Sequence, residues 1–206
     1  MVRLKPCARA HRRPSDQPHR RTASLVGREN CGRALTAECI PLNMTMPYQI
    51  IDDLAATLAK LSDAEVLDEL VAVPPLADEA DPCWNDKEYR HRVAYPYVAL
   101  WNVAAERKLR AAVPLILDRA CLGDPGEVMR NLCHVLEAIV EPDWSALTPP
   151  CVAALLSPRP GTRYWAAFEL GRLRDPVAIP ALERASGDSV SEVREEVASA
   201  LKRTRI

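Results

Sequence analysis

The sequence is short of glycine and of aromatic residues. Its 206 residues include 7 glycines and a single phenylalanine, and aromatic side chains make up 5% of the chain, whereas prolines number 18. Glycine-rich phosphate-binding loops and β-sandwiches are therefore disfavoured. Helices punctuated by proline fit this composition best.

Long apolar runs are missing as well. The best of them, Ala111 to Leu117, is followed by Asp118 and Arg119, so no stretch approaches the roughly 20 apolar residues that span a bilayer. Hydrophobic residues make up 48% of the chain, charged residues 27%, and the net charge is -1. These values predict a soluble globular protein without a membrane segment.

Paired cysteines and metal-ligand spacings are also lacking. The seven cysteines include no C-x-x-C, and Cys121, Cys133 and Cys151 lie among leucine, valine and alanine, as buried thiols do in a reducing compartment. His91 and His134 have no second ligand at a repeating spacing. Cys133 and His134 are adjacent, and adjacent side chains on a helix point about 100° apart, so they do not face each other. We expect a cytoplasmic protein with no catalytic residue, no metal and no cofactor.

Charge is spread unevenly along the chain. Residues 1–46 hold nine basic and three acidic residues, whereas residues 47–88 hold two basic and eleven acidic ones. The first block shows no apolar period and contains four prolines, which predicts a disordered basic extension. It has three alternative explanations: a nucleic-acid-binding arm, an organelle transit peptide, or a stretch upstream of the true start codon. The last is favoured because Met44 and Met46 stand where the composition changes.

The acidic block begins with an expected pair of helices. Apolar residues at helical spacing between Ile50 and Leu61 predict the first helix. The sequence Ser62-Asp63-Ala64-Glu65 is a capping box that opens a second helix running to Val73. Four carboxylates on the outward side of this pair form a candidate surface for a basic partner: Asp52, Asp53, Asp68 and Glu69.

A repeat emerges in the second half of the chain. Arg163 and Arg194 are 31 residues apart, Arg130 precedes Arg163 by 33, and Arg92 precedes Arg130 by 38. A short polar residue stands six positions before each arginine, in chain order Asp86, Asp124, Ser157 and Asp188. This spread is typical of two-helix solenoid units.

Local helix signals agree with the repeat. Asp175 and Pro176 supply an N-cap followed by a first-turn proline. Four apolar residues follow the period of one helix face: Val193, Val197, Ala200 and Leu201. In the Arg92 and Arg130 units the apolar stripe is shifted by one residue against the arginine, so these two units are weaker repeats.

Residues 160–206 resemble HEAT repeats of the short, phycobilisome-lyase-like type. The motif that carries the resemblance comprises Arg163 to Gly171, Asp175-Pro176, Ile179-Pro180-Ala181-Leu182, Asp188 and Val193-Arg194. A degenerate form extends back to about residue 86. The resemblance implies an all-α fold over residues 47–206, a right-handed α-α superhelix of three to four two-helix repeats with an N-terminal capping helix pair.

The same resemblance implies a ladder of contacts between neighbouring units. It assigns Asp188 to Arg194, and Asp124 to Arg130. At Ser157, six residues before Arg163, the acid of the motif is missing.

Protein binding without catalysis is the function that we expect. Deoxyhypusine-hydroxylase-like HEAT proteins hold iron with His-Glu pairs, and the sequence contains no His-Glu dipeptide. Nucleic-acid binding by the solenoid is disfavoured because residues 47–206 are acidic overall. A scaffold or regulator that binds another protein with a basic surface fits best. An inhibitor such as a toxin-immunity protein and a bilin-lyase-like enzyme are the alternatives.

Aromatic residues supply a second candidate surface. When the last two repeat helices are aligned on their arginines, three aromatic side chains fall at positions that are polar in the last helix: Tyr164, Trp165 and Phe168. Such residues are typical anchors of protein interfaces. The alternative is that they pack between adjacent units.

Overall fold

Helices that follow these local signals build the structure. The computed structural model describes residues 48–124 and 128–205, of which residue 130 is described in its backbone only, and these residues form no strand. The expected extension over residues 1–46 lies outside them. The helices are α1 (Tyr48–Leu58), α2 (Asp63–Ala72), α3 (Lys87–Tyr89), α4 (Tyr95–Glu106), α5 (Ala112–Arg119), α6 (Leu132–Val140), α7 (Thr148–Ala154), α8 (Pro160–Leu173), α9 (Ile179–Ala185) and α10 (Ser191–Thr204).

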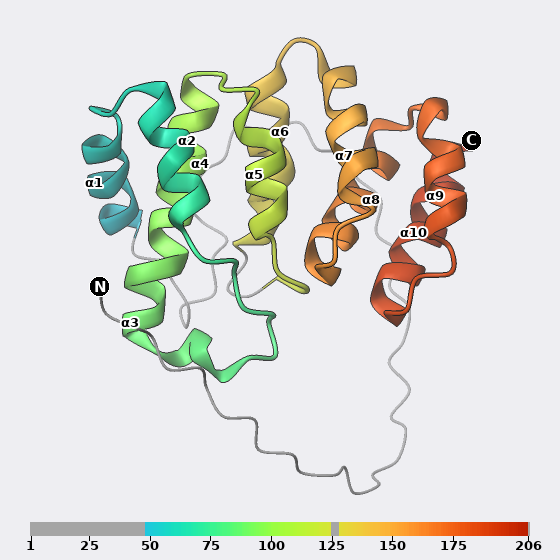
Figure 1. The fold of residues 1–206 in the computed structure, drawn as a ribbon, viewed down its shortest axis with the longest axis horizontal. Helices are drawn as coiled ribbons and strands as arrows, with labels where there is room; N and C mark the ends of the chain where they lie inside the picture. The colour runs from blue at the N-terminus through green and yellow to red at the C-terminus, as the bar shows by residue number, and fades with distance from the viewer. Residues whose placement is uncertain (1–47, 125–127, 206) are drawn as a thin grey trace, which may run out of the picture. The chain divides into compact units, whose positions relative to one another are not determined.

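The longer helices stack in two layers (Figure 1). One layer holds α1, α4, α6, α8 and α10, and the other holds α2, α5, α7 and α9. The chain changes layer at each connection, so that successive helix pairs form the units of an α-solenoid, with α1 and α2 as the predicted N-terminal pair. None of the described helices combines the length and the apolarity needed to cross a bilayer.

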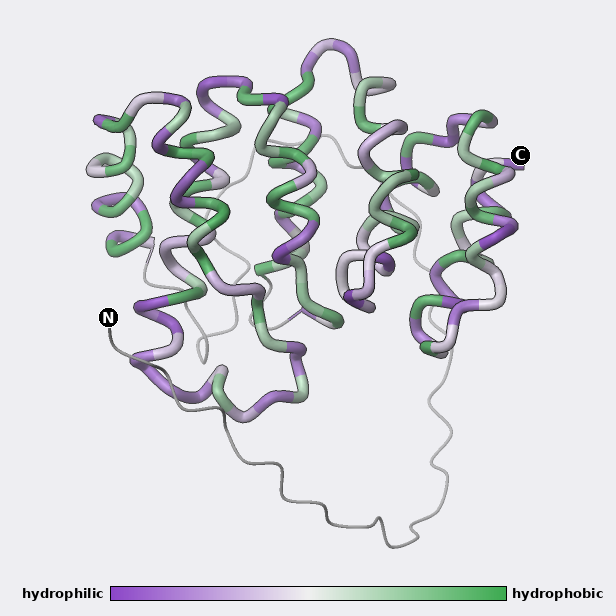
Figure 2. Tube along the Cα trace, viewed as in Figure 1, coloured by the Kyte–Doolittle hydropathy of each residue, from purple (hydrophilic) through white to green (hydrophobic). Residues whose placement is uncertain are grey.

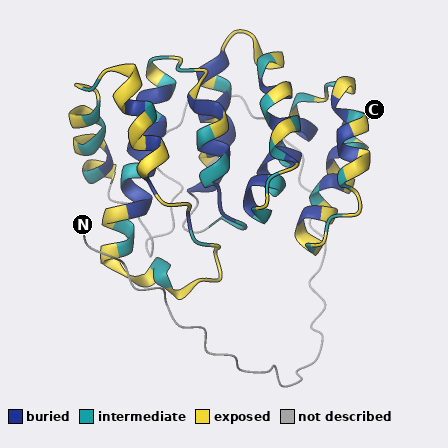
Figure 3. Ribbon diagram, viewed as in Figure 1, coloured by how far each residue is buried: buried dark blue, intermediate teal, exposed yellow. Residues whose placement is uncertain are grey.

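Apolar side chains from both layers form one buried core. Figures 2 and 3 mark the hydrophobic and the buried residues along the helices. Both stripes that the sequence places in the weaker repeats are buried: Val93, Tyr97, Leu100 and Trp101 in one, and Val128, Leu132, Val135 and Leu136 in the other. The buried hydroxyl of Tyr97 donates a hydrogen bond of 2.7 Å to the backbone oxygen of Ile116, which links α4 to α5. This bond offsets the cost of burying the hydroxyl group.

The predicted helix starts are present. The backbone N–H of Glu65 donates to Ser62 Oγ at 3.3 Å and that of Ser62 donates to Glu65 Oε2 at 2.7 Å, which completes the capping box of α2. Asp175 accepts a bond of 3.0 Å from the N–H of Val177. This cap opens a short 3-10 turn, η6 (Pro176–Ala178), which leads directly into α9.

The first full repeat begins two residues earlier than the arginine spacing predicts. Arginines of three units donate to the backbone oxygen six residues before them, in the pairs Arg90 with Trp84 (2.6 Å), Arg163 with Ser157 (2.9 Å) and Arg194 with Asp188 (2.7 Å). Arg92 instead is exposed and pairs with Glu88 on the same helical turn. Arg90 rather than Arg92 is therefore the repeat arginine, because Val93 and Tyr97 follow it by three and seven residues, as Val197 and Leu201 follow Arg194.

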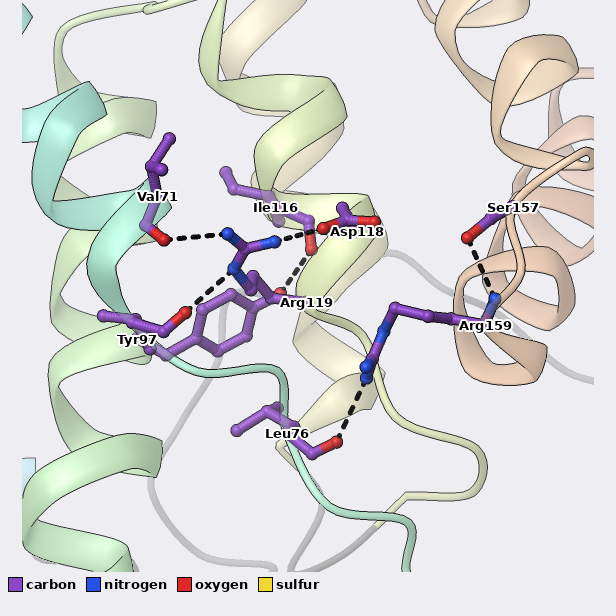
Figure 4. Close-up of polar contacts among 9 residues, drawn as sticks. Val71, Leu76, Tyr97, Ile116, Asp118, Arg119, Ser157 and Arg159 are labelled. Atoms are coloured by element: carbon purple, nitrogen blue, oxygen red, sulfur yellow. Dashed lines mark hydrogen bonds and ion pairs between the residues drawn. The ribbon is translucent and has the colours of Figure 1, made fainter. Parts of the chain in front are cut away.

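Two loops at one end of the helices are bonded to each other. The N–H of Leu76 donates to the backbone oxygen of Arg119, and that of Glu79 donates to the backbone oxygen of Leu122, both at 2.9 Å. The Arg119 side chain also donates to the backbone oxygens of Val71 and Val73, the last carbonyls of α2 (Figure 4). The end of α2 is thus capped by a residue of the next unit.

Candidate functional site

Helix α8 is fixed against the loop that follows α5. A Cβ added at Gly161 would lie 2.3 Å from the backbone carbon of Cys121 and 2.5 Å from the oxygen of Ala120, so glycine permits the close approach. One turn further along α8, the indole N–H of Trp165 donates to the backbone oxygen of Cys121 at 2.9 Å. These contacts set the position of the aromatic side chains of α8.

A groove of about 450 Å³ lies along the exposed side of α8. Three separate segments of the chain line it: Glu79 from the loop after α2, Gly123 and Asp124 from the loop after α5, and Tyr164, Trp165, Phe168 and Arg172 from α8. We call this feature the α8 groove. It contains all three of the aromatic residues that the sequence singles out.

The aromatic residues differ in exposure. Tyr164 and Phe168, one helical turn apart, are half-buried, whereas Trp165 is only 6% exposed. Trp165 packs edge-on against both rings, at centroid distances of 5.4 Å. Of the two alternatives left open by the sequence, Trp165 therefore follows the one in which the aromatic side chain packs between adjacent units, because its indole N–H binds the loop after α5. Trp165 forms the floor of the groove and supports the two rings beside it.

The mouth of the groove is acidic. Gly123 adopts a left-handed φ of 90°, and a Cβ there would lie 2.4 Å from Glu79 Oε2, so the Glu79 side chain rests directly on this glycine. Glu79 Oε2 accepts a 3.0 Å bond from the N–H of Asp124. On the opposite side, Arg172 is held by Glu137 of α6, at 2.5 Å.

Arg163 and Asp188 form an ion pair between neighbouring units. Arg163 Nε and Nη2 donate to the two carboxylate oxygens of Asp188 at 2.6 and 2.8 Å, with the side chains 12% and 8% exposed. The hydrogen bonds from Arg163 hold the pKa of Asp188 below its usual value. The resemblance assigns Asp188 to Arg194, and the two residues are bonded, but through the backbone: Arg194 donates to the backbone oxygen of Asp188, while the carboxylate of Asp188 pairs with Arg163.

The other predicted rung remains untested. Asp124 accepts a bond of 2.8 Å from the N–H of Met129. The side chain of Arg130 lies outside the described part of the chain, so its pairing with Asp124 stays a prediction.

The comparison with protein families agrees with this architecture. Residues 114–202 match the family of HEAT repeats. This stretch is similar to HEAT repeats. It runs from α5 into α10 and thus includes most of the α8 groove and the Arg163–Asp188 rung. No curated protein matches the chain.

Acidic residues that precede the matched HEAT repeats serve two different purposes. Many are used within the fold: Asp63 pairs with Arg107, Asp81 and Asp86 cap short helices, and Asp78 accepts from the N–H of Leu122. Four others are exposed on α1 and α2 and belong to no ion pair within residues 48–124 and 128–205: Asp52, Asp53, Asp68 and Glu69. We call these four residues the α1–α2 acidic face.

The buried thiols of the helical core are poor nucleophiles. Burial raises the pKa of Cys121 to about 12 and raises the pKa values of Cys133 and Cys151 still further. A thiol in such a setting stays protonated near neutral pH. His134 is exposed and lies 3.7 Å from Glu137 on the surface of α6, turned away from the buried Cys133.

One carboxyl group is buried in the interior of the repeats. Glu169 of α8 is fully buried, and burial raises its pKa, although the neighbouring Cys133 thiol and Arg172 act in the opposite direction. Within the described residues, no group of three histidine, cysteine or acidic side chains is arranged to hold a metal ion.

Proposed function

We propose that the protein is a non-catalytic scaffold or regulator that binds another protein through a basic surface of that partner. HEAT repeats generally serve as platforms for protein interactions, which supports the class of function. The observation that carries the proposal is the α1–α2 acidic face, whose four exposed carboxylates have no cationic partner in the described part of the chain. Such charges steer a basic partner into an encounter.

The residues considered for catalysis support a binding role. The buried thiols are held in their protonated form, and the carboxyl group of Glu169 has no access to solvent. A reacting group needs contact with its substrate and a pKa near the working pH. None of these groups is exposed to a substrate, and the pKa values of the thiols are raised far above neutral pH.

Narrower versions of the proposal share the same surface. An inhibitor, such as a toxin-immunity protein that neutralises a basic toxin, would also use the α1–α2 acidic face. The phycobilisome-lyase-like subtype would require a tetrapyrrole, which an absorbance titration of the purified protein detects directly. A cytoplasmic location is part of the proposal and agrees with the three buried thiols.

Affinity capture with matched charge reversals tests the proposal. The full chain carries a tag, a protein that it retains from native lysate is identified and purified, and binding is then measured at two salt concentrations. The double variant Asp52→Lys/Glu69→Lys should associate with the partner more slowly, and its association rate should depend less on salt. The reason is that charges at the rim of an interface act on the encounter rate.

The control is Glu106→Lys with Glu195→Lys, which makes the same change in net charge at exposed positions elsewhere. Equal effects of the two double variants would show that only overall charge matters. Retention of the partner with unchanged kinetics in the first double variant would refute a role for the acidic face.

A further inference from the structure

The α8 groove has the shape and chemistry of a site for one side chain. Its volume, about 450 Å³, lies in the lower part of the roughly 300–1,000 Å³ range of small-ligand pockets. Tyr164 and Phe168 flank it at a spacing of one helical turn, above the buried indole of Trp165. The walls are thus aromatic and the floor is rigid.

The charge of the groove favours a cation. Glu79 contributes an exposed carboxylate to the lining. The positive charge of Arg172 is offset by Glu137 at 2.5 Å, outside the groove lining. A positively charged group that enters the groove beside the aromatic rings therefore meets the carboxylate of Glu79.

Phe168 already takes part in a contact of the expected kind. The guanidinium carbon of Arg203, from α10, lies 5.5 Å from the centre of the Phe168 ring. Arg203 is held there by Glu196 at 2.5 Å. An aromatic ring with a guanidinium group on one side and a carboxylate nearby is the arrangement that a second arginine would meet in the groove.

We propose that the α8 groove binds an arginine side chain from an extended segment of the partner protein, with the guanidinium group stacked between Tyr164 and Phe168 and paired with Glu79. The inference rests on the proposed function, because it names the chemistry by which a basic partner is recognised. Arginine fits better than lysine, since its planar guanidinium group stacks on rings and pairs with a carboxylate through two N–H groups.

Peptide titrations followed by nuclear magnetic resonance test this site. The isotope-labelled full chain is titrated with blocked glycine peptides that carry one arginine, or in its place lysine, citrulline or glutamate. The backbone N–H of Gly123 and the indole N–H of Trp165 report on the groove. The arginine peptide should shift both signals, whereas citrulline, which has the same shape without the charge, and glutamate should leave them in place.

Two variants assign the binding energy. Glu79→Gln, which keeps an oxygen to accept from the N–H of Asp124, should weaken the arginine peptide roughly two- to fivefold. Phe168→Leu should weaken it by up to roughly tenfold. The control is Glu69→Gln, an exposed carboxylate on α2 outside the groove, which should leave the affinity unchanged.

Several results would overturn the inference. These are equal binding of the arginine and citrulline peptides, unshifted Gly123 and Trp165 signals at millimolar peptide, and an equal loss in the Glu69→Gln control. If the peptides fail while charge reversal of the α1–α2 acidic face still slows partner association, the groove inference is wrong and the proposed function stands.

Discussion

Breaking the Arg163–Asp188 rung should cost more than breaking an ordinary surface ion pair. The pair makes two parallel hydrogen bonds of 2.6 and 2.8 Å with both side chains nearly buried. Hydrogen bonds between charged groups contribute about 1.5–3 kcal/mol, whereas exposed ion pairs contribute about 0–1 kcal/mol. We expect a coupling free energy of about 1–3 kcal/mol between the two side chains.

A double-mutant cycle measures this coupling. Arg163→Gln, Asp188→Asn and the double variant are unfolded with urea at neutral pH, and the free energies of unfolding are compared. Asparagine keeps an oxygen that can accept the 2.9 Å bond from the N–H of Val190, so the loop itself is preserved.

The matched control is the cycle of Asp188→Asn with Arg194→Gln. Arg194 bonds to the backbone oxygen of Asp188, which both variants retain, so the coupling should stay below about 0.5 kcal/mol. A larger coupling with Arg194 than with Arg163 would refute the pairing.

The pH dependence of the same variants gives an independent check. Because Arg163 lowers the pKa of Asp188 in the folded state, the stability that this carboxylate contributes is present above its unfolded pKa and is lost as the pH falls through the folded value. Asp188→Asn should therefore remove part of the acid sensitivity of the wild-type protein. Identical acid unfolding curves would contradict this account.

Two further predictions concern the interior of the repeats. Gly161→Ala should lower the free energy of unfolding by about 1–3 kcal/mol, because the added Cβ would strike the backbone of Cys121. The control is Gly187→Ala, where a Cβ meets nothing within 4 Å. This variant should be close to neutral in thermal unfolding. The pKa of Glu169 is raised in the folded state, so the wild-type protein loses stability as the pH rises. Glu169→Gln removes this titration, and the variant should therefore be more stable than wild type by an amount that grows from about pH 5 to about pH 8. Urea unfolding at the two pH values measures this difference, and a difference that shrinks with pH would contradict a raised pKa of the Glu169 carboxyl group.

Signals that act within a few residues were predicted from the sequence. The capping box at Ser62, the cap at Asp175 and the buried face of α10 all depend on chemistry within one or two helical turns. The outward placement of Asp52 and Glu69 followed from the same period. For this reason the fold class was accessible from the sequence.

Contacts between distant segments were not accessible in the same way. The spacing of six residues between Asp188 and Arg194 is visible in the sequence, but the carboxylate turns to Arg163, 25 residues earlier, because neighbouring units bring the two together. Trp165 is buried by a loop 44 residues earlier in the chain. The groove likewise combines side chains from three segments, and no local pattern marks Glu79 as its rim.

The bonded loops at residues 76–81 and 119–124 bear on where the chain can be altered. Connections between helices are ordinarily the places where a protein tolerates protease cleavage or an inserted tag. Here the backbone N–H groups of Leu76 and Glu79 are bonded to the other loop, and Arg119 holds the end of α2. A reporter peptide placed in either loop would therefore separate the first two helix pairs and destabilise the fold.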